Sequence, residues 1–196
     1  MIADGFHKVP PGKVATVVTY LEMTSRPDLS ALQAPSDIQL RKVEADVAWY
    51  RDIFERVGLP WLWASRRAMD DAALAAILTD PGVDIYTLSK DGADEALLEL
   101  DFRQQGECEL AFFGLTQKMI GTGAGRFLMH NAIMEAWAKP ITRFHVHTCT
   151  FDSPQALGFY RRSGFTPIHQ EVEVDDDPRL QGTLPEDAAP RVPMFR

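Results

Sequence analysis

The sequence has few cysteines, no long apolar run and no basic cluster. Only Cys108 and Cys149 occur among 196 residues, and neither lies in a metal-binding spacing, so we expect reduced thiols, a cytoplasmic location and no metal site. No apolar stretch reaches the length of about 18 residues that a membrane span needs, and the first residues lack the apolar region of a signal peptide. A net charge of −8 without a basic run argues against nucleic acid as a partner.

The length of 196 residues fits a single domain, 1–196. β-branched or alternating runs predict strands at 14–23, 38–44, 83–89, 95–103, 107–115, 141–150 and 165–174. Helical spacing and end signals predict helices at 45–58, 69–80, 124–139 and 153–164. Asp70 and Ser153 are the expected N-caps of the second and fourth helices. This order predicts an α/β domain with a mixed sheet.

A glycine-rich turn follows the apolar run 107–115 and leads into a helix. Gly121, Gly123 and Gly125 give the spacing GxGxG, and a strand, glycine turn and helix in succession favour anion binding at the helix N-terminus. The turn lacks the Lys-Ser/Thr of a P-loop and the full spacing of a dinucleotide site. On the loop alone, a phosphate cradle and a glycine turn without a ligand both remain open.

The stretch DSPQALGFYRRSGF, 152–165, resembles the pattern N-x-x-A-[IL]-x-x-Y-x-[KR]-x-G-F of the GNAT acetyltransferases. Ser153 stands where asparagine is usual, and the remaining pattern positions match: Ala156, Leu157, Tyr160, Arg162, Gly164 and Phe165. The glycine loop resembles the family pattern [QR]-x-x-G-x-[GA], with Ile120 in place of the usual Gln or Arg. That change removes a side chain but leaves the backbone cradle, so altered pyrophosphate contacts are expected.

The resemblance covers about 38–174 and implies a single-domain GNAT-like fold: a mixed, mostly antiparallel sheet with splayed central strands and flanking helices. The strand 14–23 and the Pro- and Asp-rich tail 175–196 are interpreted as additions to this core. Acetyl-coenzyme A is the implied co-substrate. Its implied contacts are Phe113, Leu115, Gly121, Thr122, Gly123, Ala124, Gly125, Arg126 and Ser153.

Acetyl transfer to an amine needs a group that removes a proton from the amine, because an alkylammonium with a pKa of about 10.4 cannot attack. By resemblance, Glu109 is the base and Tyr160 the acid that protonates the leaving thiolate. Glu109, Ala111 and Phe113 are expected to share the face that points into the cleft. Glu99, Asp101 and Glu107 are reserves, and water could relay the proton. His145 and His147 are interpreted as surface or satisfied histidines.

The segment between the first two helices walls the acceptor pocket in many GNAT proteins. Trp61 and Trp63 could hold an alkyl or cationic group there, and Arg66 could bind a carboxylate. The alternative is that the tryptophans belong to the core and the arginines are solvated.

The resulting hypothesis is an acetyl-coenzyme A-dependent N-acetyltransferase that transfers acetyl to a primary amine of a small molecule by direct attack. The alternatives are a non-catalytic domain that binds acyl-coenzyme A, and a transferase with another acyl group or acceptor. A small-molecule amine is the expected partner, without nucleic acid or membrane. The sequence leaves homodimer formation and the identity of the acceptor open.

Overall fold

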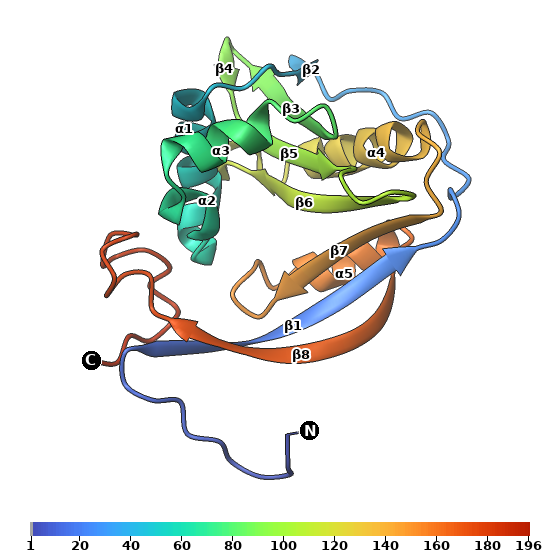
Figure 1. Ribbon diagram of the computed structural model, residues 1–196. Helices are drawn as coiled ribbons and strands as arrows, with labels where there is room; N and C mark the ends of the chain where they lie inside the picture. Colours follow the sequence, from blue (N-terminus) through green and yellow to red (C-terminus); the bar gives the residue numbers. More distant parts are fainter. Residues whose placement is uncertain (1) are drawn as a thin grey trace.

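A computed structural model describes residues 2–196. Eight strands form one sheet in the order β2-β3-β5-β6-β7-β1-β8, with the short β4 paired to β3 (Figure 1). The strands are β1 (Lys13–Met23), β2 (Ile38–Lys42), β3 (Val83–Lys90), β4 (Ala93–Asp94), β5 (Ala96–Asp101), β6 (Glu107–Leu115), β7 (Arg143–Cys149) and β8 (Thr166–Asp176). Only β6 and β7 pair in parallel. The predicted α/β fold with a mixed, mostly antiparallel sheet is confirmed.

Helices flank both faces of the sheet (Figure 1). They are α1 (Val47–Gly58), α2 (Ser65–Ala68), α3 (Asp71–Leu78), α4 (Ala124–Trp137) and α5 (Ala156–Arg162), with 3-10 turns η1 (Leu59–Trp61) and η2 (Gln117–Met119). On one face, Phe54 of α1 and Leu74 of α3 pack in a cluster with Leu97. On the other face, Leu128 of α4 packs in a cluster with Leu98 and Phe144. Because adjacent Leu97 and Leu98 serve opposite faces, β5 is buried on both sides.

Two helices start at side-chain caps, one of which, Asp70, was predicted. Asp46 accepts a hydrogen bond from Trp49 N at the start of α1, and Asp70 accepts one from Ala73 N at the start of α3. The prediction of Ser153 as the N-cap of α5 is wrong, because the helix begins at Ala156 after Gln155. The backbone carbonyl of Ser153 instead closes a turn by accepting from Ala156 N at 2.8 Å.

Strand β1, which the sequence predicts at 14–23, is an internal strand of the sheet. It pairs antiparallel with β7 on one side and with β8 on the other. Its side chains at alternate positions, Val14, Thr16 and Val18, are buried. No local pattern could show this placement, because the strands that flank β1 lie more than a hundred residues away in the chain.

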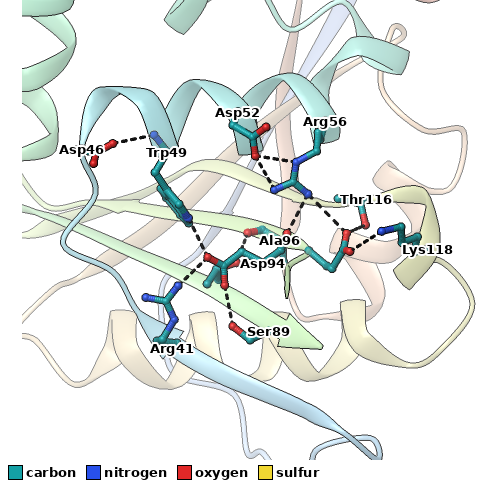
Figure 2. A network of polar contacts seen from close by, with 12 residues as sticks. Arg41, Asp46, Trp49, Asp52, Arg56, Ser89, Asp94, Ala96, Thr116 and Lys118 are labelled. Carbon is teal, nitrogen blue, oxygen red and sulfur yellow. Dashed lines mark hydrogen bonds and ion pairs between the residues drawn. The ribbon is translucent and has the colours of Figure 1, made fainter. Parts of the chain in front are cut away.

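The end of β6 is fixed to α1 and to the start of β5 through a single carboxylate. Figure 2 shows Arg56, Thr116 and Lys118 converging on this group, which belongs to Glu95. Thr116 Oγ1 donates to Glu95 at 2.5 Å, and Lys118 Nζ lies 3.0 Å from the other carboxylate oxygen. Burial alone would raise the pKa of Glu95, but these hydrogen bonds outweigh it and the pKa lies below its usual value. The network holds the position from which the glycine loop departs.

The tail after β8 folds back over the connection between α1 and α2. Leu184, Ala188 and Ala189 are buried against Leu62. Within the tail, Arg179 forms a buried ion pair with Asp177 at 2.7 Å. The tail therefore forms an ordered wall beside the segment that carries Trp61 and Trp63.

Candidate active site

The centre of the sheet opens between β6 and β7. Their parallel ladder covers only Glu107–Glu109 and Arg143–His145. Beyond these pairs the strands separate around a cavity of about 860 Å³, which both strands line. The predicted splay of the central strands is thus confirmed.

The cavity passes from the glycine loop on one side of the sheet to β1, β8 and the tail on the other. On the loop side it is lined by Gly121, Gly123, Gly125, Arg126, Tyr160 and Arg162. On the other side it is lined by Trp61, Trp63, Thr16, His147, Glu173 and Thr183, among others. The cavity therefore reaches both faces of the sheet at the point where β6 and β7 separate.

The glycine loop has the backbone shape of an anion cradle. Gly121 and Gly123 have φ values of 80° and 87°, in the left-handed region that L side chains rarely adopt. Gly123 is the N-cap of α4 and offers no side-chain acceptor, and in the first turn Thr122 Oγ1 accepts only from Ala124 N, at 3.3 Å. Arg126 follows within that turn and lines the cavity. Both the backbone and the charge suit a phosphate group.

Seven of the nine predicted cofactor contacts line the cavity: Phe113, Leu115, Gly121, Gly123, Gly125, Arg126 and Ser153. Thr122 and Ala124 do not. Thr122 Oγ1 donates to Met119 O at 2.8 Å and so shapes the loop, and Ala124 is fully buried. Ile120, which replaces the usual polar residue, lines the cavity and is 53% exposed.

Tyr160 lies in the cavity wall, held by aromatic rings. Phe113, Phe159 and Phe165 pack edge-on to its ring at centroid distances of 5.9–6.3 Å. Burial, with a smaller contribution from the charge of Asp152, raises the pKa of Tyr160 far above its usual value. Its hydroxyl forms no hydrogen bond with any residue between 2 and 196. The phenol therefore stays protonated and free to donate.

Glu109 points away from the main cavity, so the expected face shared with Phe113 is wrong. The β5–β6 register shifts at Ala111, because Leu100 pairs with Leu110 but Glu99 pairs with Phe112. This bulge puts Glu109 on the face of Phe112 rather than that of Phe113. Glu109 lines a smaller hollow of about 260 Å³ and lies 3.6 Å from His147, which does line the main cavity.

The reserve carboxylates are all held in ion pairs. Glu99 pairs with Arg66 at 2.5 Å, Asp101 with Arg103 at 2.5 Å, and Glu107 with Arg143 at 2.9 Å. Arg66 is therefore a buried structural residue, and it also lies over the Phe112 ring at 5.0 Å. Arg66 does not line the cavity, so it cannot bind a carboxylate there as predicted.

Trp61 and Trp63 line the cavity, and Trp63 also packs against the cluster formed by α1 and α3. Trp63 fits between two glycines. A Cβ atom on Gly58 would lie 2.5 Å from the Trp63 side chain, and one on Gly114 would lie 3.2 Å from it. The φ of Gly58, −92°, is one that any residue can adopt. Glycine is therefore needed there for the close approach of Trp63 and not for the backbone conformation. The Trp61 ring lies under Arg191 of the tail at 4.9 Å.

Asp152, which was not among the predicted site residues, lines the cavity just after β7. Its Oδ2 accepts from Thr148 Oγ1 at 2.7 Å and from Cys149 N at 3.0 Å, while Oδ1 accepts from Trp63 Nε1 at 3.3 Å. Asp152 therefore connects the β7 wall with the segment between α1 and α2. Its place directly before the α5 motif was the available signal.

The contributions of β8 and the tail were also missed. Glu173, Asp175 and Asp176 line the cavity from β8, and Pro178, Gln181 and Thr183 line it from the tail. Asp176 pairs with Lys13 at 2.7 Å, whereas Glu173 and Asp175 form no ion pair within residues 2–196. These residues reach the site through the long-range pairing of β1 with β8, which no local pattern reveals.

Between residues 2 and 196, no group of three His, Cys, Asp or Glu side chains is placed to hold a metal ion. No helix in this part of the chain is long and apolar enough to cross a membrane. Cys108 is buried, and burial raises the pKa of its thiol and that of Cys149. Both sulfurs are therefore weak nucleophiles in the folded protein.

Comparison with solved structures identifies the fold. The structural alignment with a GCN5-related N-acetyltransferase from Sphaerobacter thermophilus covers 86% of this chain and 53% of that protein, with a TM-score of 0.62 and 15% sequence identity. The alignment with a GCN5-related N-acetyltransferase from Kribbella flavida covers 87% of this chain and 63% of that protein, with a TM-score of 0.57 and 18% sequence identity. A third neighbour is an aminoglycoside acetyltransferase from an uncultured soil metagenomic sample, in complex with sisomicin. The alignment covers 65% of this chain and 87% of that protein, with a TM-score of 0.54 and 13% sequence identity.

No protein-family model and no curated protein matches the sequence. The chain spans only about half to two thirds of the length of the first two structural neighbours. At these identities the likeness establishes the GNAT fold.

Proposed function

We propose that this GNAT-fold chain is an acetyltransferase that transfers acetyl from acetyl-coenzyme A to a primary amine of a small cationic molecule. The observation that carries the proposal is the cavity through the sheet, which has a phosphate-type cradle on one side and unpaired carboxylates on the other. The two sides have opposite charge, as an anionic donor and a cationic acceptor would require.

The donor side fits the pyrophosphate of a coenzyme A thioester. A Cβ atom on Gly121 would meet nothing within 4 Å, so the left-handed turn leaves open space beside the backbone. The N-terminus of α4, with Arg126 and with Arg162 of α5, supplies positive charge around this space. The thioester, when bound, supplies the activated acyl carbon.

The chain supplies the proton that the leaving thiolate takes up. Tyr160 stays protonated at neutral pH and its hydroxyl has no partner among residues 2–196. Phe113 and its neighbours fix the position of the Tyr160 ring, so the hydroxyl is already placed in the cavity before the ligands bind. Tyr160 is thus the proposed general acid.

The acceptor side favours a positively charged amine. Glu173 and Asp175 of β8 attract cations, and Trp61 and Trp63 offer aromatic faces for an alkylammonium group. The structural neighbour from the soil metagenomic sample is an aminoglycoside acetyltransferase. We therefore propose an acceptor that carries at least one further positive charge besides the reacting amine.

The direct test is release of coenzyme A from acetyl-coenzyme A with a panel of amines. The panel contains spermidine, an aminoglycoside, and propylamine as an amine without a second charge. We expect release with the polycationic amines, at a higher kcat/KM than with propylamine. Binding of acetyl-coenzyme A without turnover of any amine would support the non-catalytic alternative instead. Release with propionyl-coenzyme A and not with acetyl-coenzyme A would change the proposed acyl group.

A further inference from the structure

We infer that His147 accepts the proton from the attacking amine and that Glu109 acts behind it as a positioning residue. This inference rests on the proposed acyl transfer. It replaces direct proton removal by Glu109 with a histidine–carboxylate pair at the point where β6 and β7 separate.

His147 lies at the point where β6 and β7 separate and faces the cavity. The β6–β7 ladder ends at the pair Glu109 and His145, and His147 is the next residue of β7 on the same face. It is therefore the first side chain of that face beyond the pairing, and it lines the main cavity. The bulge at Ala111 leaves Glu109 in the hollow behind it.

The geometry of the pair assigns different roles to its members. His147 Nδ1 lies 3.6 Å from Glu109 Oε1, while Nε2 has no hydrogen bond to any residue between 2 and 196. With the Glu109 carboxylate beside Nδ1, Nε2 is the ring nitrogen left to accept a proton. Imidazole is also the side chain best suited to accept a proton near neutral pH.

Asp152 is the competing acceptor in the cavity wall. Both of its carboxylate oxygens already accept hydrogen bonds, from Thr148, from Cys149 N and from Trp63. These bonds join two walls of the site, so a structural role accounts for Asp152. His147 has no such commitment at Nε2.

Other charged and titratable groups surround the pair. Tyr20 of β1 lies against the His147 ring at 5.6 Å, and its hydroxyl donates to Glu171 of β8 at 3.1 Å. His145 lies on the same face of β7, where burial lowers its pKa, and Glu107 is 3.5 Å from it. The proton acceptor therefore sits among carboxylates, with Arg143 occupied by Glu22 and Glu107.

The protons balance as follows. His147 takes one proton from the ammonium, and the freed nitrogen forms a bond to the thioester carbonyl carbon. The C–S bond breaks with its electron pair on sulfur, and Tyr160 gives its proton to that thiolate. The acylated nitrogen returns its surplus proton to Tyr160, and His147 releases the first proton to solvent. The products are an amide, a free thiol and one proton.

The test measures kcat/KM between pH 6 and 9 for the parent, His147→Gln, Glu109→Gln and the double variant, with acetyl-coenzyme A and an amine that the parent acetylates. We expect His147→Gln to lose roughly 10²-fold at neutral pH and to recover partly as pH rises and free amine increases. Glu109→Gln should lose less, on the order of tenfold. The double variant should be no worse than His147→Gln, because Glu109 acts only through His147.

His169→Gln is the matched control. His169 is as exposed as His147, it stacks on the same Tyr20 ring at 4.3 Å and it lies 3.8 Å from Glu171, but it does not line the cavity. Its loss should leave kcat/KM and the pH profile as in the parent. An acetyl-coenzyme A titration should show the same affinity for all four proteins with substitutions.

Three outcomes would overturn the pair. An active parent with an unaffected His147→Gln variant removes His147 from the mechanism and leaves the transferase proposal standing. Losses that multiply in the double variant would make Glu109 an independent base. A parent that acetylates no amine would overturn the proposed transfer together with the pair.

Discussion

At the scale of single residues, Arg66 shows how a predicted binding residue can be a structural one. Its guanidinium pairs with Glu99, whose side chain is fully buried and also accepts from the Tyr50 hydroxyl. Removal of one partner of a buried pair leaves an uncompensated charge. We expect Arg66→Ala to lower the free energy of unfolding by about 3–5 kcal/mol, measured by urea denaturation.

The neighbouring Arg67 provides the control. It pairs with Glu55 at a site where both side chains are partly exposed, at 28% and 41%. Arg67→Ala should therefore cost no more than about 1 kcal/mol. Equal losses for the two variants would show that the burial of the Arg66 pair has no special effect on stability.

Tyr160 carries the residue-scale prediction for catalysis. Tyr160→Phe keeps the ring among Phe113, Phe159 and Phe165 and removes only the hydroxyl. We expect kcat to fall roughly 10²-fold, with unchanged affinity for acetyl-coenzyme A by calorimetry. Tyr86→Phe is the control, since Tyr86 is buried, bonds to Glu135 and lies outside the cavity. If Tyr160→Phe were as active as the parent, Tyr160 would have a packing role only.

At the scale of elements, the site depends on how β6 is held. The network around Glu95 joins α1, β5 and the residues after β6, and the lowered pKa of Glu95 links it to pH. A carboxyl group whose pKa is lowered in the folded state contributes its full stabilisation to the folded protein at pH values above its unfolded-state pKa of about 4.3. That contribution is lost as pH falls through the lowered folded-state value.

Glu95→Gln should therefore be less stable than the parent at pH 7, and the difference should shrink as pH falls below about 4. Urea unfolding midpoints at several pH values measure this. Glu186→Gln is the control, because Glu186 and its partner Arg196 are both exposed. A difference between parent and Glu95→Gln that stays constant at low pH would show that the charge of Glu95 is not what holds the network.

The elements themselves were largely predictable, because periodicity and caps are local. The run 107–115 matches β6, and Asp70 caps α3 as expected. The bulge at Ala111 was not predictable, since it arises from the register with β5. One extra residue turned Glu109 to the other face and changed the assignment of the proton acceptor.

At the scale of the whole molecule, the side of the cavity proposed for the acyl donor was predictable, and most of the side proposed for the acceptor was not. The glycine loop and Tyr160 lie within two short motifs of the sequence. Thr16, Glu173 and Thr183 line the cavity only because β1 lies between β7 and β8 and the tail folds back. Contacts between segments so far apart leave no periodic pattern in either segment.

The measurement that tests the account most directly is calorimetric titration of coenzyme A into the parent, Gly123→Asp and Gly92→Asp. Both glycines have left-handed backbones, with φ of 87° and 79°, but only Gly123 lines the cavity. We expect binding to the parent and to Gly92→Asp, and affinity weaker by roughly tenfold or more, about 1.4 kcal/mol, for Gly123→Asp. No binding to the parent, or equal affinity for folded Gly123→Asp, would contradict a coenzyme A site at the glycine loop.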